Sequence, residues 1–397
     1  MANLLKGIRV LDLTNVLAGP YASYQLVQLG AQVIKVERPE EGDLARQLGP
    51  SVERNFNKMG VSFLAQNAGK QSVTLNLKDK QGRDVFLKLV QHADVVIENF
   101  RPGVMDRLGL SYAELSEANP GIIVCSISGF GQDGPMADSQ AYDQIVQGLA
   151  GVMSVTGEED SMFRVGYPVC DTIGGLTAAF AISAALVQRS RNGRGEHIDV
   201  SMLESTLSTM GWVVSNWLIA QMEPQRWGNQ NMTAAPSGAF RTKEGMLNIA
   251  ANQQAQFERL AALLERTEWL TDERFKTRED RKKNRHELTV ELEKVLSEKT
   301  AAQWVVLMRE QHIPVGEVLS VPEILAHEQI QARGFIKTVK GPDDESLNLV
   351  RSGFRLHSED PAPQSYPPRL GEHTTSILSE LGYSETEIEQ LKNSGII

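Results

Sequence analysis

Short, largely apolar runs alternate with helix-length segments through the first half of the chain, and this alternation restricts the fold more than any other feature. We interpret five runs as strands: Ile8–Leu13, Gln32–Glu37, Ser72–Leu77, Ala93–Ile97 and Gly121–Ile127. Between them, Tyr21–Leu29 and Lys80–Val90 have the apolar spacing of helices, and Asn15–Pro20 has the composition of a loop. Strands joined through helices pair in parallel and are covered on both faces. We therefore predict an α/β fold with a doubly wound, Rossmann-like parallel sheet.

The pattern changes at about residue 241, where apolar residues recur at helical spacing behind a strand at Thr242–Ile249. This change predicts a smaller inserted α+β domain. We assign residues 1–205 to a large α/β domain, 206–240 to a linker, 241–325 to the small domain, and 326–397 to a second linker and tail. The charged run Arg278–Arg285 has two interpretations, a patch that binds anions or a solvated helix face, and we favour the solvated face.

The charge balance excludes one class of partner. The 397 residues contain 40 Lys+Arg and 50 Asp+Glu, a formal net charge of −10, whereas a nucleic-acid-binding protein needs a cationic face. Two cysteines, Cys125 and Cys170, are too few for a disulfide framework and fit a reducing compartment. The first residues lack the apolar core of a signal peptide, and the most apolar stretch, Ile173–Val187, is short and rich in Ala and Gly. We expect a soluble, cytoplasmic protein with no nucleic-acid or membrane partner.

Several well-known active-site patterns do not occur. The sequence has no G-x-S-x-G, P-loop or H-E-x-x-H pattern, and its seven histidines lack the spacing of metal ligands, so we predict no metal site. Gly129–Gly134 matches G-x-G-x-x-G after a strand, which is the pattern of an NAD site when a helix follows directly. Pro135 and a loop-like segment follow instead. We interpret the motif as a glycine-rich turn and keep an NAD-dependent oxidoreductase as an alternative.

The most informative segment surrounds Asp171. A helix of small residues follows it, and Gly174 and Gly175 lie in its first turns, where each glycine costs about 1 kcal/mol relative to alanine. Such glycines indicate the close approach of another backbone or of a ligand. Asp171 has two compatible interpretations, a plain N-cap and a reactive carboxylate that the helix N-terminus keeps ionised. An ionised carboxylate is what covalent catalysis on an acyl group requires.

The order and spacing of several short motifs resemble the class III CoA-transferases, the CaiB/BaiF family that includes formyl-CoA transferase and carnitine CoA-transferase. The motifs, which cover nearly the whole chain, are Gly7–Asp12, Ala18–Pro20, Leu29–Glu37, Leu75–Lys78, Val96–Gly103, Arg107–Gly109, Ser128–Gly131, Val165–Leu176, Gly193–Met202, Ile313–Gly316 and Leu370–Thr374. The resemblance implies a large domain built from both ends of the chain and a smaller central domain. Two linkers make each subunit a ring, and two rings interlock in a homodimer.

The resemblance also implies the chemistry and the site. Asp171 matches the family's nucleophile, which forms a mixed aspartyl anhydride and then an aspartyl-CoA thioester. Coenzyme A and its acyl thioesters are substrates, with no permanently bound cofactor. By motif position the CoA-binding residues are Val16, Leu17, Ala18, Arg38, Leu75, Lys78, Asn99, Phe100, Arg101 and Arg107, and the substrate residues are Gln140, Tyr142, Asp143 and Arg46. The first loop begins with Asn15 where the family often has His, and Gln140 stands where some members have Lys.

Two functions remain open beside CoA transfer. An α-methylacyl-CoA racemase shares the fold, but Tyr142 stands at the position of its catalytic histidine, and a phenol with a pKa of about 10 is a poor base at neutral pH. A non-catalytic CoA-binding protein is the other alternative. For a transferase, Arg46, Arg101 or Arg164 is a candidate to bind a second carboxylate. We therefore expect a small dicarboxylate as acceptor and succinyl-CoA as donor.

Overall fold

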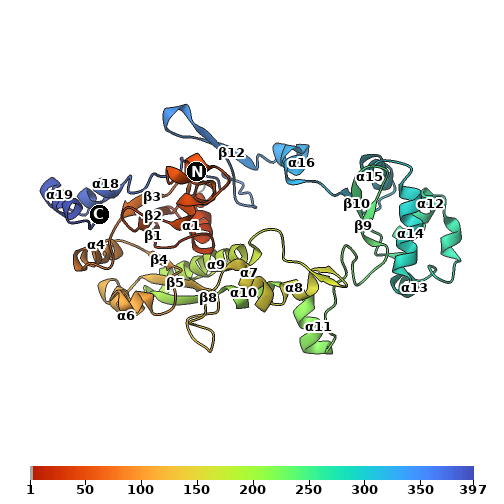
Figure 1. Cartoon of the computed structure of the whole chain (residues 1–397), viewed down its shortest axis with the longest axis horizontal. Coiled ribbons are helices and arrows are strands. Elements are labelled where there is room, and N and C mark those ends of the chain that lie inside the picture. Colours follow the sequence, from red (N-terminus) through yellow and green to blue (C-terminus); the bar gives the residue numbers. More distant parts are fainter. Residues whose placement is uncertain (1–2) are drawn as a thin grey trace. The chain divides into compact units, whose positions relative to one another are not determined.

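The computed structural model describes residues 3–397 of the chain, which form two compact units (Figure 1). The larger unit comprises the chain up to Met153, Arg164–Glu223 and Ala332–Ile397, and the smaller unit comprises Ser154–Phe163 and Pro224–Gln331. The smaller unit therefore extends beyond the predicted range 241–325 on both sides. Its early segment belongs there because Arg226 donates to the carbonyl oxygens of Glu158 and Glu159.

The larger unit is built on a six-stranded sheet in the order β3-β2-β1-β4-β5-β8. Its strands are β1 (Arg9–Asp12), β2 (Gln32–Glu37), β3 (Gln71–Thr74), β4 (Val95–Glu98), β5 (Ile123–Ser128) and β8 (Glu196–Ser201). Every pair of neighbours is parallel. The predicted α/β fold with a doubly wound parallel sheet is confirmed. The strand β8 was not predicted from the sequence.

Successive strand residues belong to two separate hydrophobic cores, because side chains alternate between the faces of a sheet. Val10, Val95 and Ile97 pack with helices α1 (Ala18–Gln28) and α9 (Val169–Asn192) on one face. Leu11 and Val96 pack with α4 (Lys80–Gln91) and α6 (Tyr112–Ala118) on the other. The remaining helices of this unit before the tail are η1 (Leu44–Gln47), α2 (Val52–Phe56), α3 (Val61–Asn67), α5 (Val104–Arg107), α7 (Asp143–Leu149), α8 (Val152–Val155), α10 (Met202–Thr209) and α11 (Trp212–Ala220).

The tail of the chain completes the second core. A hairpin of β12 (Ile336–Lys340) and β13 (Ser346–Val350) precedes the helices α18 (Thr374–Glu380) and α19 (Glu385–Asn393). Figure 1 shows these two helices, in blue, beside β3 and α4 of the first hundred residues. The Thr74 N–H donates to the Thr374 hydroxyl at 3.0 Å, and the Asn76 N–H donates to the Ile396 carbonyl at 2.7 Å. The large unit is therefore assembled from both ends of the chain.

The smaller unit is α+β. A three-stranded antiparallel sheet, in the order β11-β10-β9, packs against helices around Phe257, Leu292 and Trp304. Its elements are the short hairpin β6 (Gly157–Glu158) and β7 (Ser161–Met162), then β9 (Ser237–Arg241), β10 (Met246–Ala250), α12 (Gln254–Leu263), η2 (Thr267–Leu270), α13 (Arg278–Lys283), α14 (Arg285–Leu296), α15 (Ala301–Glu310), β11 (Val315–Glu317), α16 (Val321–Ala326) and α17 (Glu328–Ala332).

The charged run Arg278–Arg285 is not simply a solvated face. Arg281 and Arg285 are buried, with their guanidinium groups over the rings of Phe257 and Trp227. Both donate to backbone carbonyl oxygens, Arg281 to that of Ala235 at 2.9 Å. These two arginines stabilise the smaller unit, because they satisfy carbonyl groups that burial removes from water.

Helix α9 is longer than the short apolar stretch Ile173–Val187 noted in the sequence. It has 24 residues and a mean hydropathy of 1.6 over 18 of them, so its length and composition would allow it to cross a membrane. In the fold, its residues Ala178 and Ile182 belong to the first hydrophobic core, and Gly174 is buried as well. The packing is that of a core helix with one exposed side.

Candidate active site

A groove of about 300 Å³ opens beside the carboxyl ends of β1 and β2. Ligands of doubly wound sheets bind at this edge, where the strand order reverses between β1 and β4. The groove is lined by Leu13, Asn15, Val36, Glu37, Arg38, Glu41, Gly42, Leu75, Asn76, Leu77, Lys78, Phe100, Val104 and Leu108. Four predicted CoA-binding residues, Arg38, Leu75, Lys78 and Phe100, thus come together. Apolar walls with two cations suit an adenine ring and its phosphates.

The cations of this groove are accessible. The Arg38 side chain is 58% exposed and forms an ion pair with Glu41 at 2.7 Å, and Lys78 is exposed where the chain leaves β3. A surface ion pair such as that of Arg38 contributes at most about 1 kcal/mol. A phosphate can therefore displace Glu41 at little cost.

Two other predicted CoA-binding arginines lie elsewhere. Arg101 lines a separate cavity of about 50 Å³ together with Glu98, Ser126 and His197. Burial raises the pKa of Glu98 to about 7. Arg107 is exposed on α5, whose Val104 lines the groove. Arg101 therefore contacts a second polar pocket, and Arg107 stands outside the groove wall.

The loop between β1 and α1, residues 15–17, which we call the first loop, leads away from the groove. Asn99 holds its beginning through two bonds: the Asn15 N–H donates to the Asn99 side-chain oxygen, and the Asn99 amide donates to the Asn15 carbonyl, both at 2.8 Å. Asn99 thus acts on the loop's backbone. Ala18 begins α1 directly after this loop, three residues earlier than predicted, because glycine and proline are tolerated in a helix's first turn.

Asp171 is the third residue of α9 and not its N-cap, which is Pro168. The backbone N–H groups of Cys170 and Asp171 both point to the Asp143 carboxylate, at 2.8 and 3.4 Å. Asp143 in turn accepts the Gln147 amide at 2.6 Å. The plain N-cap interpretation is therefore wrong. The first turn of α9 is capped instead by a carboxylate from the start of α7.

The carboxyl group of Asp171 does not have the low pKa that its helix position suggested. Burial, and then the negative charge of Asp143, raises the pKa of Asp171 from 3.8 to about 7. Both effects disfavour the charged form. At neutral pH the group is poised between acid and carboxylate, and perturbed groups of this kind are concentrated at functional sites.

The two glycines after Asp171 are explained by contact with other backbone and side-chain atoms. A Cβ atom on Gly175 would lie 2.5 Å from the Ala18 carbonyl oxygen, and one on Gly174 would lie 3.0 Å from Cγ of Met202. Only glycine lets α9 approach α1 so closely. The second turn of α9 therefore lies beside the start of α1, one turn after Asp171, and the first loop connects the start of α1 with the groove.

The predicted substrate residues differ in their surroundings. Gln140 is exposed, as is Tyr142, which is 66% accessible at the N-cap of α7. The prediction of Arg46 as a substrate residue is wrong. Its side chain is fully buried and donates to both carboxylate oxygens of Glu37, at 2.7 and 2.8 Å. It also stacks 3.7 Å from the Phe63 ring. A guanidinium so enclosed is not available to a substrate carboxylate.

Several residues around the site were missed by sequence reasoning. Gln147 is fully buried and joins Asp143 to the segment before α9, because it also accepts the Val165 N–H at 2.8 Å. Lys35 and Asp43 form a buried ion pair beside the first loop. A lysine between the apolar residues Ile34 and Val36 was a visible signal for this pair. Asp143 lies one helical turn before Gln147, but the Val165 N–H comes from a segment 18 residues further along the chain, and no local pattern predicts that bond.

The structure also bears on the metal and NAD alternatives. Among residues 3–397, no group of three or more His, Cys, Asp or Glu side chains is arranged to hold a metal ion. The Gly129–Gly134 segment is a loop in which Ser128 accepts the Gly131 N–H and Asp199 accepts the Gln132 N–H. The next helix begins only at Asp143. The glycine-rich turn is confirmed, and the segment lacks the helix N-terminus that an NAD pyrophosphate requires.

Comparison with known proteins identifies the family of the chain. The sequence model of CoA-transferase family III matches residues 5–374. The chain belongs to this family and is a class III CoA-transferase.

Two relatives have a dicarboxylic acid in their names. The chain is 38% identical over 395 residues to the succinyl-CoA:glutarate CoA-transferase of Mus musculus, a match that covers 99% of this chain and 90% of that protein. It is also 38% identical to the acetyl-CoA:oxalate CoA-transferase of Acetobacter aceti, with 96% of each chain covered. The crystal structure of a CaiB/BaiF family protein from Brucella suis superposes with a TM-score of 0.86 at 35% identity, covering 96% of this chain and 100% of that one.

Proposed function

We propose that the protein transfers coenzyme A from succinyl-CoA to a small dicarboxylic acid, with Asp171 as the nucleophile. The observation that carries the proposal is the placement of a half-buried carboxylate on the first turn of α9, one turn before Gly175, where α9 packs against the start of α1 and the end of the loop that begins in the groove. The two relatives described above have glutarate and oxalate in their names, and the acceptor class common to both is a dicarboxylate.

The proposed reaction has two symmetrical halves. The Asp171 carboxylate attacks the thioester carbonyl carbon of the donor, the C–S bond breaks, and CoA leaves as a thiolate, so that a mixed anhydride joins Asp171 to the succinyl group. The thiolate then attacks the Asp171 carbonyl carbon of that anhydride, which releases succinate and leaves an aspartyl-CoA thioester. The acceptor carboxylate repeats both steps in reverse order and leaves as its CoA ester, while Asp171 regains its carboxylate. Because bonds of similar energy are exchanged, positioning and oxyanion stabilisation supply the catalysis.

The start of α1 is suited to stabilise the oxyanion. The first N–H groups of a helix have no partner within the helix, and they carry a positive partial charge. The α1 N-cap is Leu17, a residue without a polar side chain, and no side-chain cap bond occurs there. We place the thioester carbonyl oxygen against the Leu17 and Ala18 N–H groups, with the CoA chain running back along Asn15 into the groove.

Arg164 is our candidate for binding the second carboxylate of the acceptor. Arg46 is buried and Arg101 lines the small cavity beside Glu98, whereas Arg164 is exposed. Its neighbour Val165 donates to Gln147, which donates to Asp143, whose carboxylate caps the Asp171 turn. This series of bonds ties the Arg164 backbone to the nucleophile. A cation held in this way would select dicarboxylates over monocarboxylates.

Exposed apolar side chains support the proposed interlocked homodimer. Leu176 and Phe180 project from α9, and Trp212, Leu218 and Ile219 project from α11, each at least 49% exposed. Side chains of this size in contact with water favour burial by a second surface. We propose that a second copy of the chain covers them, which light scattering of the purified protein would measure as a doubled mass.

Both cysteines are free and buried, which suits the proposed cytoplasmic location.

The test of the function uses the purified protein with succinyl-CoA and a series of acids: oxalate, glutarate, and the monocarboxylates acetate and butyrate. Mass spectrometry follows new CoA esters and a covalent adduct on Asp171. We expect transfer to a dicarboxylate, loss of transfer in Asp171→Asn, and a loss of dicarboxylate preference in Arg164→Gln that Arg164→Lys partly restores. Transfer that survives in Asp171→Asn would refute the nucleophile. Deuterium exchange at the α-carbon of a 2-methylacyl-CoA without transfer would identify a racemase instead.

A further inference from the structure

Val16 in the first loop has a backbone conformation that its side chain disfavours. Its φ is +67°, in the left-handed region, where a branched Cβ collides with the backbone. Such a conformation persists only where the surrounding structure enforces it, and it is concentrated at functional sites. Val16 lies between Asn15, which lines the CoA groove, and Leu17, the N-cap of α1. The direction in which α1 begins therefore depends on this one residue.

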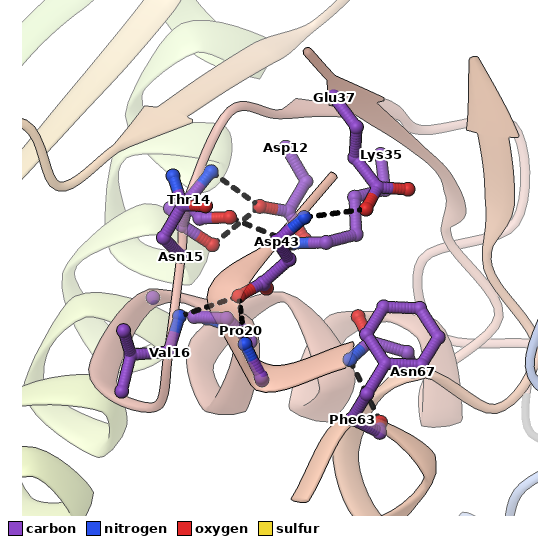
Figure 2. Close-up of polar contacts among 12 residues, drawn as sticks. Asp12, Thr14, Asn15, Val16, Pro20, Lys35, Glu37, Asp43, Phe63 and Asn67 are labelled. Carbon is purple, nitrogen blue, oxygen red and sulfur yellow. Dashed lines mark hydrogen bonds and ion pairs between the residues drawn. The ribbon is translucent and has the colours of Figure 1, made fainter. Parts of the chain in front are cut away.

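Asp43 holds Val16 in this conformation. One carboxylate oxygen of Asp43 accepts the Val16 N–H at 2.9 Å and the Ala45 N–H at 2.8 Å, as Figure 2 shows for Val16. The other oxygen lies 2.9 Å from the Lys35 ammonium, and both side chains are fully buried. Lys35 also donates to the Thr14 carbonyl at 2.7 Å. The ion pair is therefore hydrogen-bonded to the backbone on both sides of Asn15, to the Thr14 carbonyl and the Val16 N–H.

The charges around this pair are balanced. Asp12, two residues before Thr14, accepts the Lys70 ammonium at 2.9 Å and the Thr14 N–H at 2.9 Å, and its side chain is also fully buried. Burial alone would raise the pKa of Asp43, but the Lys35 charge and the two N–H groups outweigh it and lower that pKa. Asp43 is therefore an ionised acceptor, and hydrogen bonds to ionised acceptors are about twice as strong as neutral ones.

We propose that Asp43 is a positioning residue for the transfer reaction: through the Val16 N–H it fixes the first loop so that the start of α1 meets the thioester beside Asp171. The inference rests on the proposed role of Asp171. Asp43 touches neither substrate nor Asp171, and it acts through a backbone conformation. If the Val16 conformation is what Asp43 maintains, a residue that adopts a positive φ without cost makes Asp43 less necessary.

The experiment combines changes at both positions. Asp43→Ala removes the acceptor, and Asp43→Asn keeps an oxygen that is neutral. In each background Val16 is replaced either by Gly, which accepts φ of +67°, or by Ala, which removes the two methyl groups of valine but keeps the Cβ atom and its conformational cost. The matched control Arg189→Met breaks the ion pair with Asp94, which directly precedes β4 at the amino ends of the strands, opposite the groove. Thermal melting verifies folding, and kcat and KM for succinyl-CoA are measured for each variant.

We expect kcat to fall about 100-fold in Asp43→Ala, the typical loss when one oxyanion donor is misplaced, and about 10-fold in Asp43→Asn. Val16→Gly should restore kcat about 10-fold in either background, whereas Val16→Ala should not, and Arg189→Met should lower the melting temperature without changing kcat. If Asp43→Ala does not fold, the Asp43→Asn series decides the question. Wild-type kcat in a folded Asp43 variant, or equal effects of Gly and Ala at position 16, would overturn the proposal. Asp171→Asn serves as the reference, since activity in that variant refutes the nucleophile and not the role of Asp43.

Discussion

Replacing Asp171 with asparagine should make the protein more stable at pH 8, although it removes the proposed nucleophile. The reason is that the folded chain holds this carboxyl group where its charge is unfavourable. Burial and the charge of Asp143 raise the pKa of Asp171 from 3.8 to about 7. Asparagine occupies nearly the same volume and has no proton to lose.

The magnitude follows from the two pKa values. Below pH 3.8 the group is protonated in both the folded and the unfolded chain, and it contributes no pH dependence. Between 3.8 and about 7 the folded chain retains a proton that the unfolded chain has lost, so the free energy of unfolding falls as pH rises, by about 1.4 kcal/mol per pH unit. The total loss for Asp171 is about 4 kcal/mol, complete above pH 7. The Asp171→Asn variant does not lose this free energy of unfolding, because the asparagine side chain does not ionise.

Urea unfolding of the wild type and of Asp171→Asn, followed by circular dichroism at intervals from pH 4 to pH 8, measures the effect. The difference in unfolding free energy between the two proteins should widen steadily in favour of the variant, by about 4 kcal/mol over this range. The exposed Asp138→Asn variant is the control and should parallel the wild type. If Asp171→Asn also runs parallel to the wild type, the carboxyl group of Asp171 is ordinary in the folded protein, and the argument from its burial fails.

Three further outcomes are expected. In the wild type, kcat/KM for succinyl-CoA should rise with pH and level off above about pH 7 as Asp171 ionises. Asp143→Asn should move the midpoint of this pH profile lower. A midpoint that stays in place would exclude an influence of the Asp143 charge on the pKa of Asp171. Gly175→Ala should unfold more easily by about 1–3 kcal/mol, since its Cβ would lie 2.5 Å from a carbonyl oxygen, whereas Gly353→Ala, with no atom within 4 Å, should melt like the wild type. Arg281→Met should cost about 2 kcal/mol by leaving buried carbonyl groups unpaired without changing kcat, and a loss of kcat would contradict its purely structural role.

The sheet was predictable because its signal is local. Apolar strands such as Gln32–Glu37, which matches β2 residue for residue, alternate with amphipathic helices, and the pairing rules then leave few arrangements. The start of α1 was not predicted because Gly19 and Pro20 suggest a loop, although a helix tolerates them in its first turn. The strand β8 was missed because its exposed Glu196 and His197 resemble a surface segment.

The candidate site was predictable only in part. Motif order brought Arg38, Lys78 and Phe100 to one groove, as expected. Arg46 was wrongly assigned, because a sequence shows an arginine without showing that Glu37, nine residues earlier, encloses it. Asp43 was missed for a related reason: Lys35 indicated a buried partner without showing which carboxylate it is, and the bond from the Val16 N–H to Asp43 is one that no side-chain pattern encodes.

The joining of the two chain ends has a consequence for synthesis of the protein. Asn76, at the wall of the CoA groove, donates its N–H to Ile396, and β3 is bonded to Thr374. A chain emerging from the ribosome at about 5–20 residues per second presents β1, β2 and β3 long before these partners exist. The substrate groove is therefore among the last parts of the protein to be completed, and a nascent chain must keep the edge of its sheet uncovered for some tens of seconds.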